Sequence, residues 1–551
     1  MPRIERPGWG AFLPLYALRT RGEWGVGSFG DLARLVRWMR SLGGSVVGTL
    51  PLLAQFLEEP FEYSPYSPAS RLFWNELFVD VEATPELARS AEARELVART
   101  DTARLRRGRL VDYRRAYAAK RPVLDALSRA FFDSDGPRDR RGAFERYRRE
   151  TPHLDDYARF RAFGERTRTA WHDWPARQRA GELTPRDVDP HAVRFHQYVQ
   201  FVADEQLGAI GKTAPGEGLF LDLPLGVHGA SYDTWRFRDS FADGVAGGAP
   251  PDTFFTKGQN WGFPPLHPRR IRENGYAYVR ACLRQLMKHA GVIRIDHVLG
   301  FHRLYWIPDG MRPTEGVYVR YPAEELYAVL SLEAHRASAA VVGEDLGTVP
   351  PMVRAAMARH GVLRSHVAEM EALLDRRPPL PPAPRESLAA LNTHDMATFA
   401  SFWEGRDVDD RLELGLIDEG EAKRQRGERR RLTHLLTGQF RVEGHLPKRG
   451  PQVAPTALAA AAAHAHLAAG PARVQIVNLE DLWGETEPQN RPGTYRDRPN
   501  WRRRAARTFE GFRSDPEILG RLEEVNRLRA EAAERERPGQ GRRRRVEEAS
   551  T

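Results

Sequence analysis

Residues 292–297 read Val-Ile-Arg-Ile-Asp-His, a short apolar run that ends in charged residues. The segment before this run predicts a helix, because its apolar residues recur at the three-four spacing of one helix face: Val279, Cys282, Leu283, Leu286 and Met287. Gly291 is expected to stop that helix. A helix followed by a buried apolar strand is the repeating unit of an α/β fold.

The same pattern occurs three more times, and each expected strand again ends in an acidic residue. These strands cover residues 219–224, 339–344 and 388–395. Together with 292–296 they supply four carboxyl groups: Asp222, Asp296, Glu344 and Asp395. In a (β/α)₈ barrel the carboxyl ends of all strands meet at one rim, so we expect these side chains to converge.

The length of 551 residues accommodates such a barrel with inserted pieces. We therefore predict an α/β fold, a (β/α)₈ TIM barrel with inserted, mainly helical subdomains. A helix over 29–42, ended by Gly43-Gly44, and a buried strand over 45–51 open the barrel. The expected organisation is 1–83 for the first part of the barrel, 84–205 for a helical insertion rich in Arg, Ala, Glu and Leu, 206–535 for the remainder with a Gly/Pro-rich loop at 244–268, and 536–551 for a disordered tail.

Composition limits the function classes. Lys and Arg number 84 against 74 Asp and Glu, and the excess is spread along the chain, apart from the arginine run 542–545 in the tail. This favours a mixed-charge surface over a nucleic-acid site. Residues 1–10 lack the apolar core of a signal peptide, and no apolar run reaches the ~18 residues of a membrane span. The Ala-rich run 457–469 reads as an ordinary helix.

Cys282 is the single cysteine, so it cannot form an internal disulfide or a cysteine metal cluster. Its place on the apolar helix face predicts a buried, inert thiol. The sequence therefore favours a cytoplasmic protein that binds neither membranes nor nucleic acid, and no metal or other cofactor is expected.

Several carboxylates at a barrel rim are compatible with three kinds of chemistry: divalent-metal binding, proton abstraction next to a carbonyl, and cleavage of a glycosidic bond. Arg294 lies two residues before Asp296 and points to the same face of the strand. A cation there would repel a metal ion and keep Asp296 ionised. The pattern therefore favours glycoside chemistry.

Retaining glycoside cleavage needs one carboxylate that attacks the anomeric carbon and one carboxylic acid that protonates the leaving oxygen. Asp296 fits the anion. Glu344 fits the acid, because a short apolar strand precedes it and burial raises a carboxyl pKa. Asp395, beside His394, would hold sugar hydroxyls and stabilise the positive charge that develops on the ring.

Sugar binding also needs exposed aromatic rings, which stack on the apolar face of glucose. Tyr66, Trp235 and Trp261 are the candidates. For a single tryptophan, core packing is the commoner role, and Trp261 is the exception because it lies in the Gly/Pro-rich loop.

Motifs along nearly the whole chain resemble the amylomaltase, or disproportionating-enzyme, family of 4-α-glucanotransferases, glycoside hydrolase family 77 of the α-amylase clan. The residues that carry this resemblance are Gly25-Val26-Gly27-Ser28-Phe29-Gly30-Asp31-Leu32, Ser64-Pro65-Tyr66, Asp222-Leu223-Pro224, Pro250-Pro251-Asp252, Gly258-Gln259-Asn260-Trp261-Gly262, Arg294-Ile295-Asp296-His297, Gly343-Glu344-Asp345-Leu346-Gly347, Thr393-His394-Asp395 and Asn490-Arg491-Pro492-Gly493-Thr494.

The resemblance implies Asp296 as nucleophile, Glu344 as acid/base and Asp395 as transition-state stabiliser, the same roles that the residue types suggest. It also implies that the other matching polar and aromatic residues bind substrate: Ser64, Tyr66, Asp222, Asp252, Gln259, Trp261, Arg294, His297, His394 and Asn490. The implied activity is transfer of α-1,4-glucan segments from a donor maltooligosaccharide to the 4-OH of an acceptor glucan or glucose, through a covalent glycosyl-Asp intermediate.

Two alternatives stay open at this point. The same three carboxyl groups would serve a hydrolase, and a barrel of this kind could bind glucans without catalysis. Transfer is favoured because the loop 244–268 can cover the site, exclude water and offer Gln259 and Trp261 to an acceptor sugar.

Overall fold

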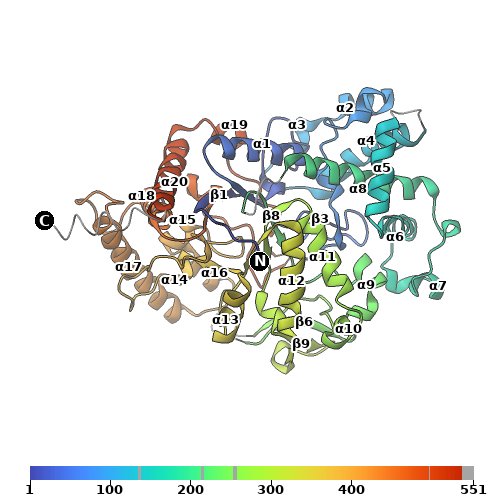
Figure 1. The fold of residues 1–551 in the computed structure, drawn as a ribbon. Helices are drawn as coiled ribbons and strands as arrows, with labels where there is room; N and C mark the ends of the chain where they lie inside the picture. Colours follow the sequence, from blue (N-terminus) through green and yellow to red (C-terminus); the bar gives the residue numbers. More distant parts are fainter. Residues whose placement is uncertain (134–137, 212–215, 252–256, 496, 537–551) are drawn as a thin grey trace.

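The core of the protein is a closed barrel of eight parallel strands (Figure 1). The computed structural model describes residues 1–133, 138–211, 216–251, 257–495 and 497–536. In barrel order the strands are β1 (Gly8–Phe12), β14 (Val474–Asn478), β13 (Ser387–Ala390), β12 (Leu363–Val367), β11 (Ala340–Gly343), β8 (Ala290–Ile295), β5 (Gly218–Leu223) and β2 (Val46–Gly48). This confirms the predicted TIM barrel.

The register of the barrel strands determines where the acidic residues lie. In β8 and β11, Ile295 is paired with Gly343, so Asp296 and Glu344 each follow a paired residue directly. In β5 and β8, Asp222 is paired with Arg294. Side chains fill the barrel below this level, including Phe220, Val292, Val342 and Ile476. The barrel is therefore a packed core with its polar groups at the carboxyl-terminal rim.

Helices cover the outside of the barrel. Ser28 caps α1 (Phe29–Ser41) in a reciprocal pair of hydrogen bonds with Asp31. The other helices on or near the barrel are α10 (Pro268–Glu273), α11 (Ala277–Met287), α12 (Ala323–Ala337), α13 (Pro351–His360), α18 (Thr456–Ala469) and α20 (Pro516–Arg535). Cys282 on α11 is 2% exposed, and burial raises its pKa to about 12, as expected of an inert thiol. Among the described residues, none of the helices combines the length and the apolar character needed to span a membrane.

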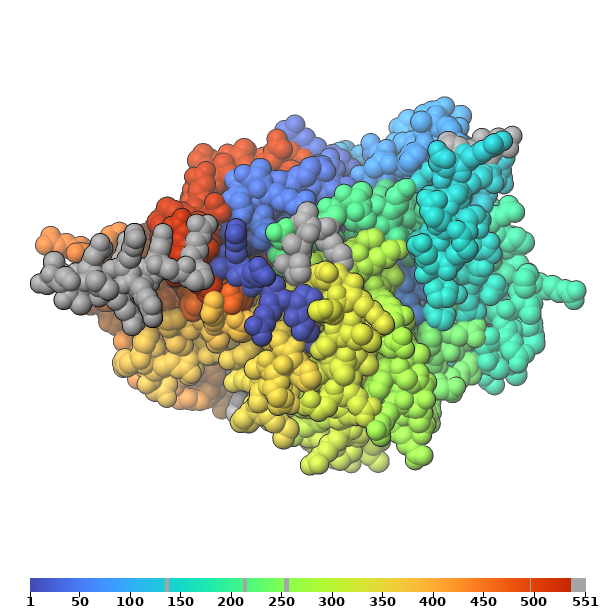
Figure 2. Space-filling model, viewed as in Figure 1, coloured from blue at the N-terminus to red at the C-terminus, as the bar shows by residue number. Residues whose placement is uncertain are grey.

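The stretch 84–205 is mainly helical where the structure describes it, and it forms the right-hand side of the molecule in Figures 1 and 2. Its helices are α2 (Ala91–Arg99), α3 (Thr102–Leu105), α4 (Tyr113–Asp133), α5 (Arg138–Glu150), α6 (Leu154–Thr167), α7 (Ala176–Arg179) and α8 (Pro190–Ile210). The long helix α8 packs against both α4 and α6, and also contacts α1 of the barrel. On the opposite side of the molecule lie α15 (Phe399–Glu404), α16 (Arg406–Glu413) and α17 (Glu419–Val442) (Figure 1).

The segment 244–268 is not the simple loop that the sequence predicts. It contains β6 (Val245–Ala249) and β7 (Gln259–Asn260), which join β9 (Arg303–Pro308) and β10 (Val317–Arg320) in an antiparallel sheet. The strand β6 reads Val-Ala-Gly-Gly-Ala, too rich in glycine to predict a strand. Hydrogen bonding to β9 stabilises β6 as a strand, although its local sequence does not favour one.

Other boundaries also differ from the expectations. The helix before β8 ends at Met287, and Gly291 lies inside the strand. The strand expected over 388–395 ends at Ala390, which leaves Asp395 on the loop beyond it. Apart from Glu536, the expected tail lies outside the described residues.

His464 on α18 should make the fold sensitive to acid. Its side chain is 3% exposed, and neither ring nitrogen has a hydrogen-bond partner among the described residues. Burial, with a smaller contribution from Arg521, lowers the pKa of His464 to about 3. An unfolded histidine titrates near ~6.5, so protons bind preferentially to the unfolded chain between these values and stability falls as the pH drops.

When the pH falls from about 6.5 to about 4, the unfolding free energy of the unmodified protein should therefore decrease by about 3 kcal/mol more than that of His464→Leu. Urea titrations at several pH values measure this difference. His434→Leu, at an exposed position on α17, should behave as the unmodified protein does. Parallel pH dependences for His464→Leu and the unmodified protein would contradict the prediction.

Candidate active site

Carboxyl groups from different barrel strands meet at the rim. Asp222 lies within β5, Asp296 directly follows β8, and Glu344 directly follows β11. Asp395 lies on the loop after β13 and reaches the same centre through its neighbour His394. The sequence predicts this convergence, and the structure brings the four groups together.

Asp296 is held by contacts on both of its carboxylate oxygens. Nη1 of Arg294 lies 2.9 Å from Oδ1, and the amide of Leu225 donates to Oδ2 at 3.3 Å. Burial raises the pKa of Asp296, and Arg294 opposes that rise. Arg294 favours the ionised carboxylate, as expected, but burial outweighs the arginine and the net shift of the Asp296 pKa is upward. The side chain keeps 19% of its surface exposed, so it can contact a substrate.

Glu344 has the environment of a carboxylic acid that is protonated near neutral pH. Its residue is 9% exposed, and burial raises the pKa of Glu344 to about 7. Arg294 and two backbone amides oppose the shift: His297 donates to Oε2 at 3.0 Å and Leu346 donates to Oε1 at 2.8 Å. The amide of His297, the residue after Asp296, thus ties Glu344 to its neighbour across the strand pair.

Asp395 has the lowest pKa of the three expected catalytic carboxyl groups. Nε2 of His394 lies 3.2 Å from its Oδ2, and Asn490 donates from Nδ2 to Oδ1 at 2.7 Å. Although burial acts in the opposite direction, these contacts lower the pKa of Asp395 to about 2. Its side chain is 38% exposed, which leaves room for a ligand.

Tyr66 connects the two sides of the rim. Its hydroxyl donates to Oδ2 of Asp222 at 2.6 Å and lies 2.6 Å from Nε2 of His394. The rings of Tyr66 and His394 stack with centroids 5.2 Å apart. The backbone amide of Tyr66 donates a hydrogen bond to Oγ of Ser64 at 3.3 Å, which helps to fix the position of this tyrosine.

Arg294 lies between two of the carboxylates. Its Nη1 is 2.7 Å from Oδ2 of Asp222 and 2.9 Å from Oδ1 of Asp296. The guanidinium thus takes the position between these anions that a metal ion would need. Within the described part of the chain, no group of three or more His, Cys, Asp or Glu side chains is placed to hold a metal ion.

Trp261 and Gln259 approach the rim from the small antiparallel sheet. Nε1 of Trp261 donates to Oε1 of Gln259 at 3.1 Å, and the Trp261 ring lies edge-on to His297 with centroids 5.3 Å apart. Burial lowers the pKa of His297 to about 4, so its ring is neutral near neutral pH. Half-exposed Trp261 thus lies beside the residue that follows Asp296. Asp252, expected on the same segment, lies outside the described residues.

Trp235 is not part of the site. Its side chain is fully buried, and its Nε1 donates to the carbonyl of Gln178 at 2.8 Å in the helical segment. Of the two roles open to Trp235, the structure therefore supports core packing and not sugar stacking, because the ring packs in the core between the barrel and the helices.

Two features of the site were not predicted from the sequence. The ring of Trp501 lies 5.3 Å from Tyr66 and 5.9 Å from His394. Below the Asp395 loop, Asn392 donates to Oδ2 of Asp481 at 3.0 Å, and burial raises the pKa of Asp481 to about 7. A single tryptophan is more often a core residue than a site residue, so the sequence does not single out Trp501.

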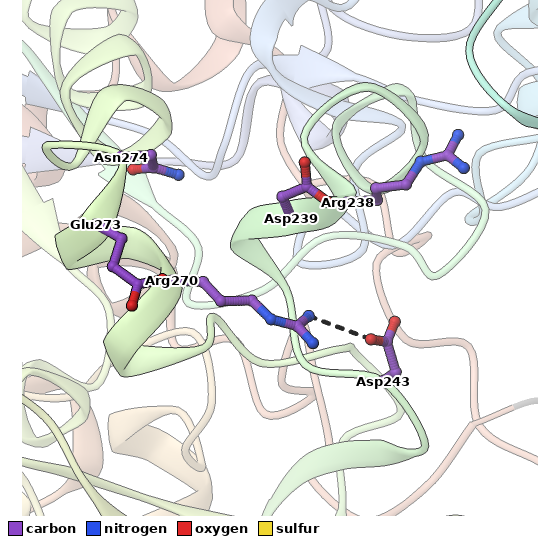
Figure 3. A pocket seen from close by; sticks show the side chains of 6 residues that line it. All are labelled: Arg238, Asp239, Asp243, Arg270, Glu273 and Asn274. Atoms are coloured by element: carbon purple, nitrogen blue, oxygen red, sulfur yellow. Dashed lines mark hydrogen bonds and ion pairs between the residues drawn. The ribbon is translucent and has the colours of Figure 1, made fainter.

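A hollow of about 560 Å³ lies on the surface between the 238–243 segment and α10, away from the four carboxyl groups (Figure 3). Figure 3 shows Arg270 pointing toward Asp243, while Arg238 points away from both. Nη1 of Arg270 lies 3.2 Å from Oδ2 of Asp243. All six lining residues are polar or charged, so the hollow offers no aromatic ring to a sugar: Arg238, Asp239, Asp243, Arg270, Glu273 and Asn274. The barrel rim, where the perturbed carboxyl groups and aromatic rings meet, is the better candidate.

Comparison with known proteins supports this choice. The model of the family described as 4-alpha-glucanotransferase matches residues 13–508. A 4-alpha-glucanotransferase of Mycobacterium tuberculosis is 37% identical over 532 residues, which cover 90% of this chain and 71% of that protein. One of Haemophilus influenzae is 30% identical over 556 residues, covering 95% and 78% of the two chains.

Solved structures agree with these relatives. The crystal structure of amylomaltase from Corynebacterium glutamicum matches 95% of this chain and 75% of its own, with a TM-score of 0.83 and 29% sequence identity. The amylomaltase from Streptococcus agalactiae in complex with acarbose shares the fold, with a TM-score of 0.75 at 19% identity over 95% of this chain and 99% of that one.

Proposed function

Since this chain belongs to the 4-alpha-glucanotransferases of glycoside hydrolase family 77, we propose that it transfers α-1,4-glucan segments by a retaining double displacement at Asp296 and Glu344. The observation that carries this proposal is the pairing of Ile295 with Gly343. In that register the carboxyl groups of Asp296 and Glu344 lie next to each other at the rim, and the pKa of Glu344 is about 7.

In the first step, a carboxylate oxygen of Asp296 attacks the anomeric carbon of the donor glucan. The bond from that carbon to the glycosidic oxygen breaks, and Glu344 donates its proton to this oxygen as the reducing-end fragment leaves. Asp395 carries a full negative charge at this moment, because its pKa is about 2, and stabilises the positive charge on the sugar ring. The product is a covalent glycosyl ester of Asp296.

In the second step, Glu344 acts as a base. Its carboxylate removes the proton from the 4-OH of an acceptor glucan or glucose, and the acceptor oxygen attacks the anomeric carbon while the ester bond to Asp296 breaks. Glu344 then carries the proton again and Asp296 is free. The two inversions restore the α configuration, so the product is again an α-1,4-glucan.

Transfer rather than hydrolysis requires that a sugar hydroxyl, and not water, reaches the glycosyl ester. We propose that half-buried Trp261, which contacts His297, and the neighbouring Gln259 cover this approach. We assign the substrate contacts around the centre to the residues that the motifs singled out: Ser64, Tyr66, Asp222, Asp252, Gln259, Trp261, Arg294, His297, His394 and Asn490.

We further propose that α-1,4-glucans and maltooligosaccharides are the partners of this enzyme. A reducing cytoplasm suits its single cysteine, Cys282, which has no second cysteine in the sequence to pair with.

Incubation with maltotriose tests the proposed transfer. We expect a ladder of longer maltooligosaccharides together with free glucose, because the maltosyl or glucosyl group on Asp296 passes to another sugar. Chromatography of the products over time measures the ladder. Glucose and maltose as the sole products would mean that water intercepts the intermediate and that the enzyme is a hydrolase.

A further inference from the structure

Arg71 is a buried arginine that has no part in the site as described so far. It is 6% exposed and lies in β4 (Ser70–Trp74), which pairs with β3 (Leu53–Ala54) in a small sheet outside the barrel. Burying a guanidinium is costly unless its N–H groups are paired. The partners of Arg71 therefore indicate its role.

The guanidinium binds the backbone of a turn at the barrel rim. Nη1 of Arg71 donates to the carbonyl oxygen of Pro224 at 3.0 Å and to that of Leu225 at 2.9 Å. The amide of Leu225 donates to Oδ2 of Asp296 at 3.3 Å. The carbonyl of Pro224 and the amide of Leu225 belong to one peptide group. This group therefore lies between the guanidinium of Arg71 and the carboxylate of Asp296.

The orientation of this peptide group suits both charges. A peptide dipole has its negative end at the carbonyl oxygen and its positive end at the amide, so the cation and the anion each stabilise it. Hydrogen bonds in series also polarise one another, most strongly in apolar surroundings. A cavity of about 80 Å³ beside the turn is lined mainly by apolar residues, among them Phe263, Leu283 and Phe301. The contacts on the turn therefore form in surroundings that strengthen them.

Arg71 is itself held in place from its other side. Its backbone amide donates to Oδ2 of Asp233 at 2.8 Å, and its Nε donates to the hydroxyl of Tyr278 at 3.0 Å. The Tyr278 hydroxyl donates to the same oxygen of Asp233 at 2.5 Å, and the hydroxyl of Ser70 donates to the other oxygen at 2.5 Å. Asp233 and Tyr278 are fully buried. These contacts fix the direction of the Arg71 side chain toward the turn.

We propose that Arg71 is a positioning residue for the nucleophile Asp296. It orients the Pro224–Leu225 peptide group so that the amide stays on Oδ2 of Asp296 and stabilises the ionised carboxylate. Arg294 contacts Oδ1 of the same carboxylate, so one arginine acts directly and the other acts through the backbone. Loss of Arg71 should therefore make Asp296 harder to ionise. This inference rests on the proposed function, because it assumes that Asp296 attacks as an anion.

Other charged and titratable groups also influence Asp296. They lie on β5, on β8, on the loops that follow β11 and β13, and at Tyr66: Asp222, Arg294, Glu344, His394, Asp395 and Tyr66. The groups that influence Arg71 are Tyr278, Cys282 and Asp233. All of them are retained when Arg71 is replaced, so the difference between two pH profiles reports the loss of Arg71.

The pH dependence of the first chemical step tests this role. Release of fluoride from an α-maltosyl fluoride measures that step, and it needs an ionised Asp296 but no proton from Glu344. Arg71→Met removes a cation and two hydrogen bonds from the turn, so the pKa of Asp296 should rise. The fall of kcat/KM on acidification, the acid limb, should then begin about one pH unit higher than in the unmodified enzyme. Arg71→Lys keeps the charge, so its acid limb should lie between the two.

Arg529→Met is the matched control. Arg529 is also a buried arginine that binds backbone carbonyl groups, with Nε donating to Gly8 at 3.1 Å and Nη1 to Gly470 at 2.9 Å. Its loss should lower the temperature of unfolding and leave the acid limb in place. With maltotriose, the decline of kcat/KM above about pH 7 that we expect from Glu344 should be unchanged in Arg71→Met.

A lower kcat/KM at every pH, with the acid limb of Arg71→Met unmoved, would assign Arg71 a purely structural role and overturn the proposal. If Arg71→Met does not fold, Arg71→Gln, which keeps an N–H donor but not the charge, should shift the acid limb in the same direction. An unmodified enzyme that forms no ladder from maltotriose would refute the proposed transfer. Fluoride release would still decide the role of Arg71, because a transferase and a hydrolase share the first step.

Discussion

Changing Asp296 to Asn is expected to lower kcat for maltotriose by about 10⁴-fold or more, because the amide cannot form the glycosyl ester. The substitution keeps the shape of the side chain, so glucan binding should persist. Initial rates measure the loss, and fluorescence titration with maltotriose measures binding through Trp261 at the site. Asp243→Asn, in the hollow of Figure 3, is the matched control and should retain full activity.

A smaller side chain at the same position tests the face of attack. In Asp296→Gly, azide can enter the space of the missing carboxylate and react with an α-maltosyl fluoride. Attack from that side inverts the anomeric carbon, so the expected product is the β-maltosyl azide. Formation of the α-azide, or full maltotriose activity in Asp296→Asn, would refute Asp296 as the nucleophile.

Changing Glu344 to Gln should lower kcat/KM for maltotriose by about 10³-fold, since the amide cannot protonate the leaving oxygen. An α-maltosyl fluoride needs no such proton, because fluoride leaves as an anion. The first step with this donor should therefore slow less than about tenfold, and release of fluoride measures it. Glu273→Gln, at the surface hollow, is the control for a carboxyl-to-amide change outside the rim.

The pH profile gives a second measure of the same role. Burial raises the pKa of Glu344 to about 7, and the group must be protonated to act as an acid. For the unmodified enzyme, kcat/KM for maltotriose should therefore fall as the pH rises above about 7. This alkaline decline should be absent from the fluoride release of Glu344→Gln. Equal losses on both donors, with the decline unchanged, would assign the proton to another group.

The strands that end in an acid could be predicted from the sequence for a simple reason. Both faces of β8 and β11 are buried, and Arg294 is the one charged residue in either strand, so each reads as a nearly continuous apolar run. The charge that follows then marks the rim. The gathering of Asp296 and Glu344 follows from barrel geometry alone, once both strands are recognised.

Three barrel strands were not predicted, and each lacks that signal. The strand β1 carries Gly8 and Gly10, which weaken any strand pattern. In β12 the outward residues are polar: Nε of Arg364 donates to Asp345 at 2.8 Å, and His366 is buried against the helical layer. In β14, Gln475 interrupts the apolar run and bonds to the carbonyl of His464. Arg364 and Gln475 are stabilised by tertiary contacts that no local pattern reveals.

The long-range contacts of the site could not be predicted from the sequence either. Asp395 lies beyond the end of β13 and owes its position to Asn490, far along the chain. Trp501 joins Tyr66 from the opposite half of the protein. Motif spacing predicts which residue types take part, whereas these partnerships depend on how loops from distant strands fold over the rim.

The pairing of β1 with β14 has a consequence for biosynthesis. Gly10 lies opposite Ile476, so the first barrel strand to be made keeps one edge uncovered until the last barrel strand has left the ribosome. Until then, the nascent chain contains an open sheet with two unpaired edge strands, and such strands can pair with other chains and cause aggregation. Chaperone protection during translation should therefore matter more for this enzyme than for a protein whose neighbouring strands pair as they emerge.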